Sequence, residues 1–195
     1  MSAKETHSTT AAVLDVTPTG VESSAEGRAF ARPELLGPII AVLVVLSFAT
    51  LSFRHAIVGA AFAGVLVVLA AIDLERGIIP NRIVLPAAGA LYVLQLALFP
   101  SHVLAWTLAP LTASLLLALP HLFGRSWMGM GDVKLALLIG VALGWQVFTA
   151  LLVAFLCLFP VALFMIAHEG LGARKKTIPF GPFMALGALI VLFLS

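Results

Sequence analysis

The sequence has few charged residues and only one cysteine. It carries 11 basic and 9 acidic side chains in 195 residues, a charged fraction of 10%. Soluble globular domains carry about 25%, so the composition excludes an ordinary soluble domain. The single cysteine, Cys157, lies inside an apolar run, which excludes an internal disulfide and a cysteine-based metal cluster.

The histidines are also too few and too scattered to form a metal site. There are five, and His168-Glu169 begins like a zinc protease motif, but Gly172 stands where the second histidine would be. We therefore expect neither a metal nor a cofactor. The chain has no basic face on a soluble domain, so we expect no nucleic-acid partner.

Apolar residues make up most of what is present, 62% of the chain, with a mean hydropathy of +1.14. Apolar runs of about 17 residues or more recur, which is typical of a polytopic helical membrane protein. Residues 133–167 are too many for one straight span, and Gly144-Trp145-Gln146 is the expected break. We predict an all-α transmembrane bundle of about seven spans: 35–53, 56–72, 83–99, 103–123, 133–145, 146–167 and 180–195.

Residues 1–34 differ from the rest of the chain. They are polar, rich in Ser, Thr, Ala and Gly, and show no helical periodicity. We predict a disordered cytoplasmic tail at 1–34 and a transmembrane domain at 35–195. No apolar segment typical of a signal peptide follows the start.

The basic residues indicate the orientation of the spans. With the tail inside and seven alternating spans, ten of the 11 basic residues fall in the cytoplasm and only Arg54 falls outside. If residues 133–167 formed a single span, seven basic residues would fall in the cytoplasm and four outside, so seven spans fit the charges better. Arg174, Lys175 and Lys176 favour a cytoplasmic loop beside anionic membrane lipid.

The same topology brings two acids to one side of the membrane. Beyond residue 34 the acids are Asp73, Glu75, Asp132 and Glu169, all predicted to be cytoplasmic. Asp73 ends the second span and Asp132 begins the fifth, and a predicted hairpin of two spans separates them. A compact bundle could therefore bring Asp73 and Asp132 together.

Structural explanations compete with a catalytic one. Asp132 could cap the helix that it begins and share its charge with Lys134. Asp73 sits where a helix dipole disfavours negative charge, and Arg76 or Arg82 could pair with it. Acids beside a membrane span are candidates for function by default. That function could be catalysis, or cation binding and proton transfer in a carrier.

Three segments resemble a known family. "AIDLERGIIPNRIVLP" (71–86) and "GMGDVKLALLIG" (129–140) are similar to the two signature segments of the prepilin peptidases, the GxGD-type aspartic proteases of bacterial membranes. "IPFGPFMALGA" (178–188) resembles the third recurring segment of that family. The resemblance covers about residues 56–188, and the order of the segments makes it more specific than a lone Gly-x-Gly-Asp.

The resemblance implies a function and a site. It maps the two catalytic aspartates of the family onto Asp73 and Asp132, and the glycines of its signature onto Gly129 and Gly131. It assigns structural support to the third segment, 179–182. It implies cleavage, after a glycine, of a prepilin or pseudopilin-like precursor with a basic leader and an apolar helix, at the bacterial inner membrane.

The N-terminal region departs from that of larger family members, which carry paired cysteines associated with methylation. The tail in this sequence has no cysteine. The resemblance is therefore to short, peptidase-only members, and we expect no methyltransferase activity. An ion- or proton-coupled carrier that uses Asp73 and Asp132 is the alternative, and an inactive scaffold of a secretion apparatus is a third possibility.

Overall fold

The computed structural model describes residues 33–123, 129–169 and 179–194. The predicted tail lies outside these residues except for its last two positions, and so do Arg174, Lys175 and Lys176. The described residues form seven α-helices and two short 3-10 turns, with no strand among them. The elements are α2 (Pro33–Thr50), α3 (Phe53–Arg76), α4 (Asn81–Leu98), η1 (Pro100–His102), α5 (Val103–Phe123), α6 (Met130–Leu143), η2 (Gly144–Gln146), α7 (Val147–Glu169) and α8 (Gly181–Leu194).

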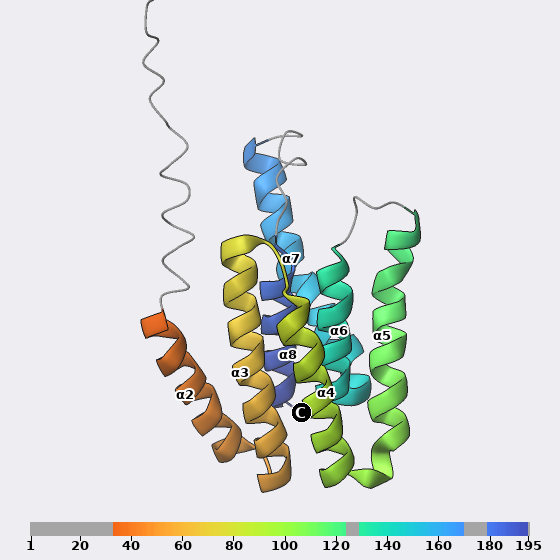
Figure 1. Cartoon of the computed structure of the whole chain (residues 1–195). Helices are drawn as coiled ribbons and strands as arrows, with labels where there is room; N and C mark the ends of the chain where they lie inside the picture. The colour runs from red at the N-terminus through yellow and green to blue at the C-terminus, as the bar shows by residue number, and fades with distance from the viewer. Residues whose placement is uncertain (1–32, 124–128, 170–178, 195) are drawn as a thin grey trace, which may run out of the picture.

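The helices alternate in direction along the bundle (Figure 1). The C-terminal ends of α3, α5 and α7 lie at one end of the bundle, together with the N-terminal ends of α4, α6 and α8. This arrangement confirms the predicted all-α polytopic helical bundle. Among the residues that the structure describes, four helical stretches are long and apolar enough to cross a membrane: Phe53–Arg76, Asn81–Leu98, Pro100–Leu119 and Met130–Phe164. α2 and α8 are apolar but shorter.

The predicted break in the longest apolar run is confirmed. α6 ends at Leu143, the chain turns through η2, and α7 runs back in the opposite direction (Figure 1). Gly144 makes the turn with a φ of 59°, a conformation that side chains with a Cβ rarely adopt. A Cβ at Gly144 would also lie 2.8 Å from the ring of Trp106. Backbone conformation and packing therefore both require glycine here.

The core lies between α3, α4, α5, α6, α7 and α8, whereas α2 packs chiefly on α3. Its largest fully buried side chains include Phe62 and Leu66 of α3, Leu138 and Ile139 of α6, and Met184 of α8. Large apolar side chains also point outward, such as Leu104 (74% exposed) and Leu156 (70% exposed). Apolar residues on both the inside and the outside are expected of a bundle surrounded by lipid.

Candidate active site

Asp73 lies in the last turn of α3, and its side chain is only 5% exposed. Its carboxylate accepts a hydrogen bond from the backbone N–H of Gly181, with 3.1 Å between N and Oδ2. Gly181 is the first residue of α8, 108 positions later in the chain. A buried acid is thus held by the N-terminus of a distant helix.

This contact resolves the unfavourable position of Asp73 on its own helix. The C-terminal end of α3 carries a partial negative charge, whereas the N-terminal end of α8 carries free N–H groups and a partial positive charge. Arg76 and Arg82, the partners considered from sequence, are both exposed, and the hydrogen bond to Asp73 comes from Gly181 instead. The positive end of α8 therefore compensates the carboxylate.

Gly181 allows this close approach because it has no side chain. A Cβ at this position would lie 2.5 Å from Oδ2 and 3.0 Å from Cγ of Asp73. Contacts this short force one group to move. The absence of a Cβ therefore fixes how near α8 can come to Asp73.

Asp132 is the third residue of α6 and is partly buried. Gly129 occupies the N-cap position and no side chain caps the helix, so the capping explanation considered for Asp132 does not hold. The backbone N–H of Asp132 donates to the oxygen of Gly129 (3.1 Å), and Asp132 Oδ2 would lie 3.4 Å from a Cβ at Gly129. The glycine before the helix therefore lies close to the acid.

The two aspartates lie at the same end of the bundle, where α3 ends and α6 begins (Figure 1). α3 and α6 are in contact, and the two carboxyl groups are near enough for a charge on Asp73 to influence Asp132. The tertiary structure therefore brings Asp73 and Asp132, which are 59 positions apart in the sequence, to the same end of the bundle.

The connection between α3 and α4 is fastened to the start of α6 by two contacts. Lys134 Nζ donates a hydrogen bond of 2.6 Å to Asn81 Oδ1 at the start of α4. Ile79 covers Gly131 so closely that a Cβ there would lie 3.0 Å from Ile79 Cβ. Lys134, considered from the sequence as a partner for the charge of Asp132, makes its hydrogen bond to Asn81. Both contacts hold α4 against the helix that carries Asp132.

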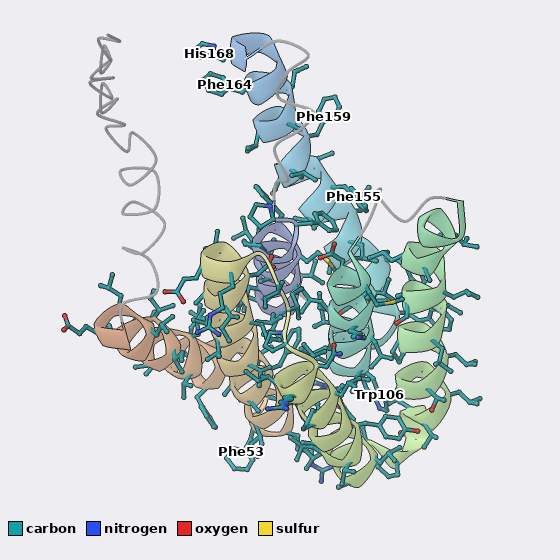
Figure 2. All side chains as sticks on the ribbon, turned by 45° about the horizontal axis from the view of Figure 1, so that its top comes forward. Phe53, Trp106, Phe155, Phe159, Phe164 and His168 are labelled. Atoms are coloured by element: carbon teal, nitrogen blue, oxygen red, sulfur yellow. The ribbon has the colours of Figure 1, made fainter. Side chains whose placement is uncertain are left out.

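An aromatic contact supports the segment before α8. The rings of Phe155 on α7 and Phe180 pack with centroids 5.0 Å apart, and Phe180 directly precedes Gly181. Figure 2 shows Phe155 on the part of α7 that passes the start of α8. α7 therefore helps to position the residue that binds Asp73.

The sequence did not reveal which contacts join these segments. Gly181 and Asn81 stood within the recognised segments, but the hydrogen bonds that they make were not predicted. Gly181 binds a residue 108 positions away, and Asn81 binds one 53 positions away. Motif spacing along the chain does not predict contacts over such separations. Within the described residues, no group of three His, Cys, Asp or Glu side chains could hold a metal ion.

Comparison with known proteins identifies the family of this chain. The profile of the Type IV leader peptidase family matches residues 60–166, a stretch that includes both Asp73 and Asp132. The chain belongs to this family. It is 32% identical over 143 residues to a prepilin leader peptidase/N-methyltransferase of Aeromonas salmonicida (strain A449). It is also 32% identical over 147 residues to a protein of the same name from Aeromonas hydrophila.

These relatives are longer than this chain. Each match covers 66% of the chain and 46% of the relative. The chain therefore spans about half the length of the curated relatives that it matches. No solved structure matches the chain.

Proposed function

We propose that this protein is a membrane-embedded aspartic endopeptidase that removes the basic leader from a prepilin or pseudopilin-like precursor. The observation that carries the proposal is that Asp73 and Asp132 lie at the same end of the bundle, with Asp73 held by the backbone N–H of Gly181. The family membership supports peptidase chemistry, and the names of the Aeromonas relatives support a prepilin substrate.

The proposed mechanism uses the two carboxyl groups as one unit. Two neighbouring carboxylates do not both ionise easily, so the pair holds one proton. The ionised member takes a proton from a water molecule, which attacks the carbonyl carbon of the scissile peptide bond. The protonated member donates its proton to the carbonyl oxygen. When the tetrahedral intermediate breaks down, the C–N bond is cleaved and the leaving amine receives a proton.

The proposed substrate follows from the location of the pair. Both aspartates lie at the helix ends where Arg76, Arg82 and Lys134 are found, and basic residues favour the cytoplasmic side. We therefore place the site at the cytoplasmic face of the inner membrane. A precursor with a cytoplasmic basic leader and an apolar helix in the bilayer presents its junction at this depth. The leader would be cleaved after a glycine.

The test is cleavage by purified protein in detergent, with no ion gradient. The substrate is a prepilin-like precursor with a short basic leader, a glycine before the scissile bond and an apolar helix. Asp73→Asn and Asp132→Asn should each lower the cleavage rate by about 10²–10⁴-fold or more, because each removes one member of the acid–base pair.

Glu75→Gln is the matched control. It makes the same change from carboxylate to amide two residues from Asp73, at an exposed position, and should leave the rate unchanged. Cleavage at the normal rate by either aspartate variant would refute the dyad. If the wild-type protein fails to cleave the precursor but moves cations or protons across vesicles, it is a carrier.

A further inference from the structure

A cavity of about 290 Å³ opens at the end of the bundle far from the aspartates. Its wall is built from the start of α3, the connection between α4 and α5, the start of α5 and the turn between α6 and α7. Rings supply most of the large side chains on this wall: His55, Phe99, His102, Trp106 and Trp145. Figure 2 shows Trp106 on α5 and, outside the wall, Phe53 at the start of α3. The proposed cleavage reaction uses none of these residues.

The rings meet at steep angles rather than in a stack. The planes of Phe99 and Trp106 are inclined by 56°, with the centroids 6.3 Å apart. Those of His102 and Trp106 are inclined by 75° at the same distance, and the ring of His55 lies 4.5 Å from that of Phe99. Rings around one cavity at such angles resemble the aromatic cages that bind ammonium groups by cation–π attraction. Single interfacial rings need no ligand, but this cluster offers one.

A guest can reach the side chains of this wall. His55, His102 and Trp145 are exposed, and Phe99 and Trp106 are only partly buried. A neutral imidazole also has one nitrogen that accepts a hydrogen bond. A primary ammonium donates up to three hydrogen bonds, whereas a quaternary ammonium has no N–H to donate. The two imidazoles among the rings therefore favour a primary ammonium.

Arg54 lies beside the cavity and lacks a carboxylate partner at this end of the bundle. It precedes His55 and is exposed, and its Nη1 donates to the backbone oxygen of Leu98, 3.5 Å away and next to Phe99. The acids that the structure describes lie toward the other ends of their helices: Glu34, Asp73, Glu75, Asp132 and Glu169. A phosphate from outside the chain would pair well with this guanidinium.

We propose that the cavity binds the headgroup of phosphatidylethanolamine. The ammonium of the lipid lies among the rings, and its phosphate pairs with Arg54. The headgroup carries both groups a short ethylene chain apart, which suits the adjacent positions of Arg54 and His55. The apolar spans begin and end at this level of the bundle, so lipid headgroups surround it. The bound headgroup joins the ends of α3, α4 and α5 to the turn between α6 and α7.

The test is a thermal-shift measurement on the whole chain purified in detergent. Phosphatidylethanolamine, phosphatidylcholine and phosphatidylglycerol with identical acyl chains are added separately, and soluble phosphoethanolamine is added in a further sample. At about 100 times its Kd, phosphatidylethanolamine should raise Tm by roughly 5–10 °C. The others should each raise it by less than half as much. Phosphatidylcholine lacks N–H donors, phosphatidylglycerol lacks an ammonium, and soluble phosphoethanolamine lacks the acyl chains that hold it at the surface.

The same series can overturn the proposal. An equal rise with phosphatidylcholine or phosphatidylglycerol would overturn the assignment to a primary ammonium. An equal rise with soluble phosphoethanolamine would overturn a lipid as the source of the headgroup. These comparisons use the wild-type chain, so they remain decisive if a variant fails to fold.

Two variants locate the bound headgroup. Trp145→Leu and Arg54→Gln change exposed side chains, so the bundle should still fold, and each should reduce the rise caused by phosphatidylethanolamine by half or more. Phe53→Leu is the control for the ring, because Phe53 is 72% exposed at the same end and lies outside the cavity wall. Arg82→Gln, at an exposed position of the other end, is the control for the charge. Both controls should keep the wild-type rise. An unchanged rise in Trp145→Leu would overturn the ammonium site, and an unchanged rise in Arg54→Gln would overturn the phosphate contact.

Discussion

Substituting Gly181 by alanine tests how α8 positions Asp73. The added Cβ would lie 2.5 Å from Oδ2 and 3.0 Å from Cγ of the carboxylate. Ordinary van der Waals contact begins near 3.4 Å, so the carboxylate or the start of α8 must move by about 0.9 Å. The backbone N–H remains in this variant. The substitution therefore displaces Asp73 without deleting its hydrogen-bond donor.

A displacement of about 1 Å at reacting groups can cost on the order of 10²-fold in rate. We expect Gly181→Ala to lower kcat for leader cleavage by about that factor, with a smaller change in KM. The assay is cleavage of the prepilin-like precursor in detergent, followed by gel electrophoresis or mass spectrometry. The Tm measured on the same preparation shows whether the bundle is still folded.

Gly89→Ala is the matched control, because a Cβ on this helical glycine meets nothing within 4 Å. It should retain wild-type cleavage, and Ala in a helix is favoured over Gly by about 1 kcal/mol. The explanation would be refuted if Gly181→Ala cleaved the precursor at the wild-type rate. It would also be refuted if its loss of activity matched a loss of folded protein.

Two further substitutions test the contacts around the site. Lys134→Met removes the exposed hydrogen bond to Asn81, which is worth roughly 1 kcal/mol or less, so kcat should fall by up to about fivefold. The double variant Lys134→Met/Asn81→Ala should have nearly the same kcat as Lys134→Met alone, because the bond is already lost. A further fall in kcat on adding Asn81→Ala would contradict the pairing. Gly140→Ala places a Cβ 2.5 Å from Pro110 Cα and should destabilise the protein by about 1–3 kcal/mol. An unchanged Tm would show that α5 and α6 can move apart to accommodate the added Cβ without loss of stability.

The helices were the most predictable feature of this protein. A run of apolar residues long enough to cross a bilayer must satisfy its backbone hydrogen bonds within itself, so it forms a helix whatever its neighbours are. The break at Gly144 was predictable for the same reason, because residues 133–167 exceed the thickness of a bilayer and contain one polar interruption with a glycine. Local helix starts were less certain, since α6 begins at Met130 rather than at 133.

The contacts of the candidate site were only partly predictable. The charges and the alternation of spans indicated that Asp73 and Asp132 share a side of the membrane. The start of α8 beside Asp73, the bond between Lys134 and Asn81 and the buried Gln95 were not foreseen. Gln95 was visible in the sequence as a polar residue within a span, a position that usually calls for a partner. Its partners, however, lie on another helix.

The sequence by itself determined that this chain is a helical membrane bundle, how its spans alternate and which family it resembles. These properties depend on apolar length, charge distribution and short motifs, all of which are local along the chain. Only the tertiary structure decided which helix end meets Asp73 and what surrounds Gln95 and Trp106. Those contacts depend on how closely helices distant in sequence approach each other, and that distance is set by packing at glycines such as Gly181 and Gly140.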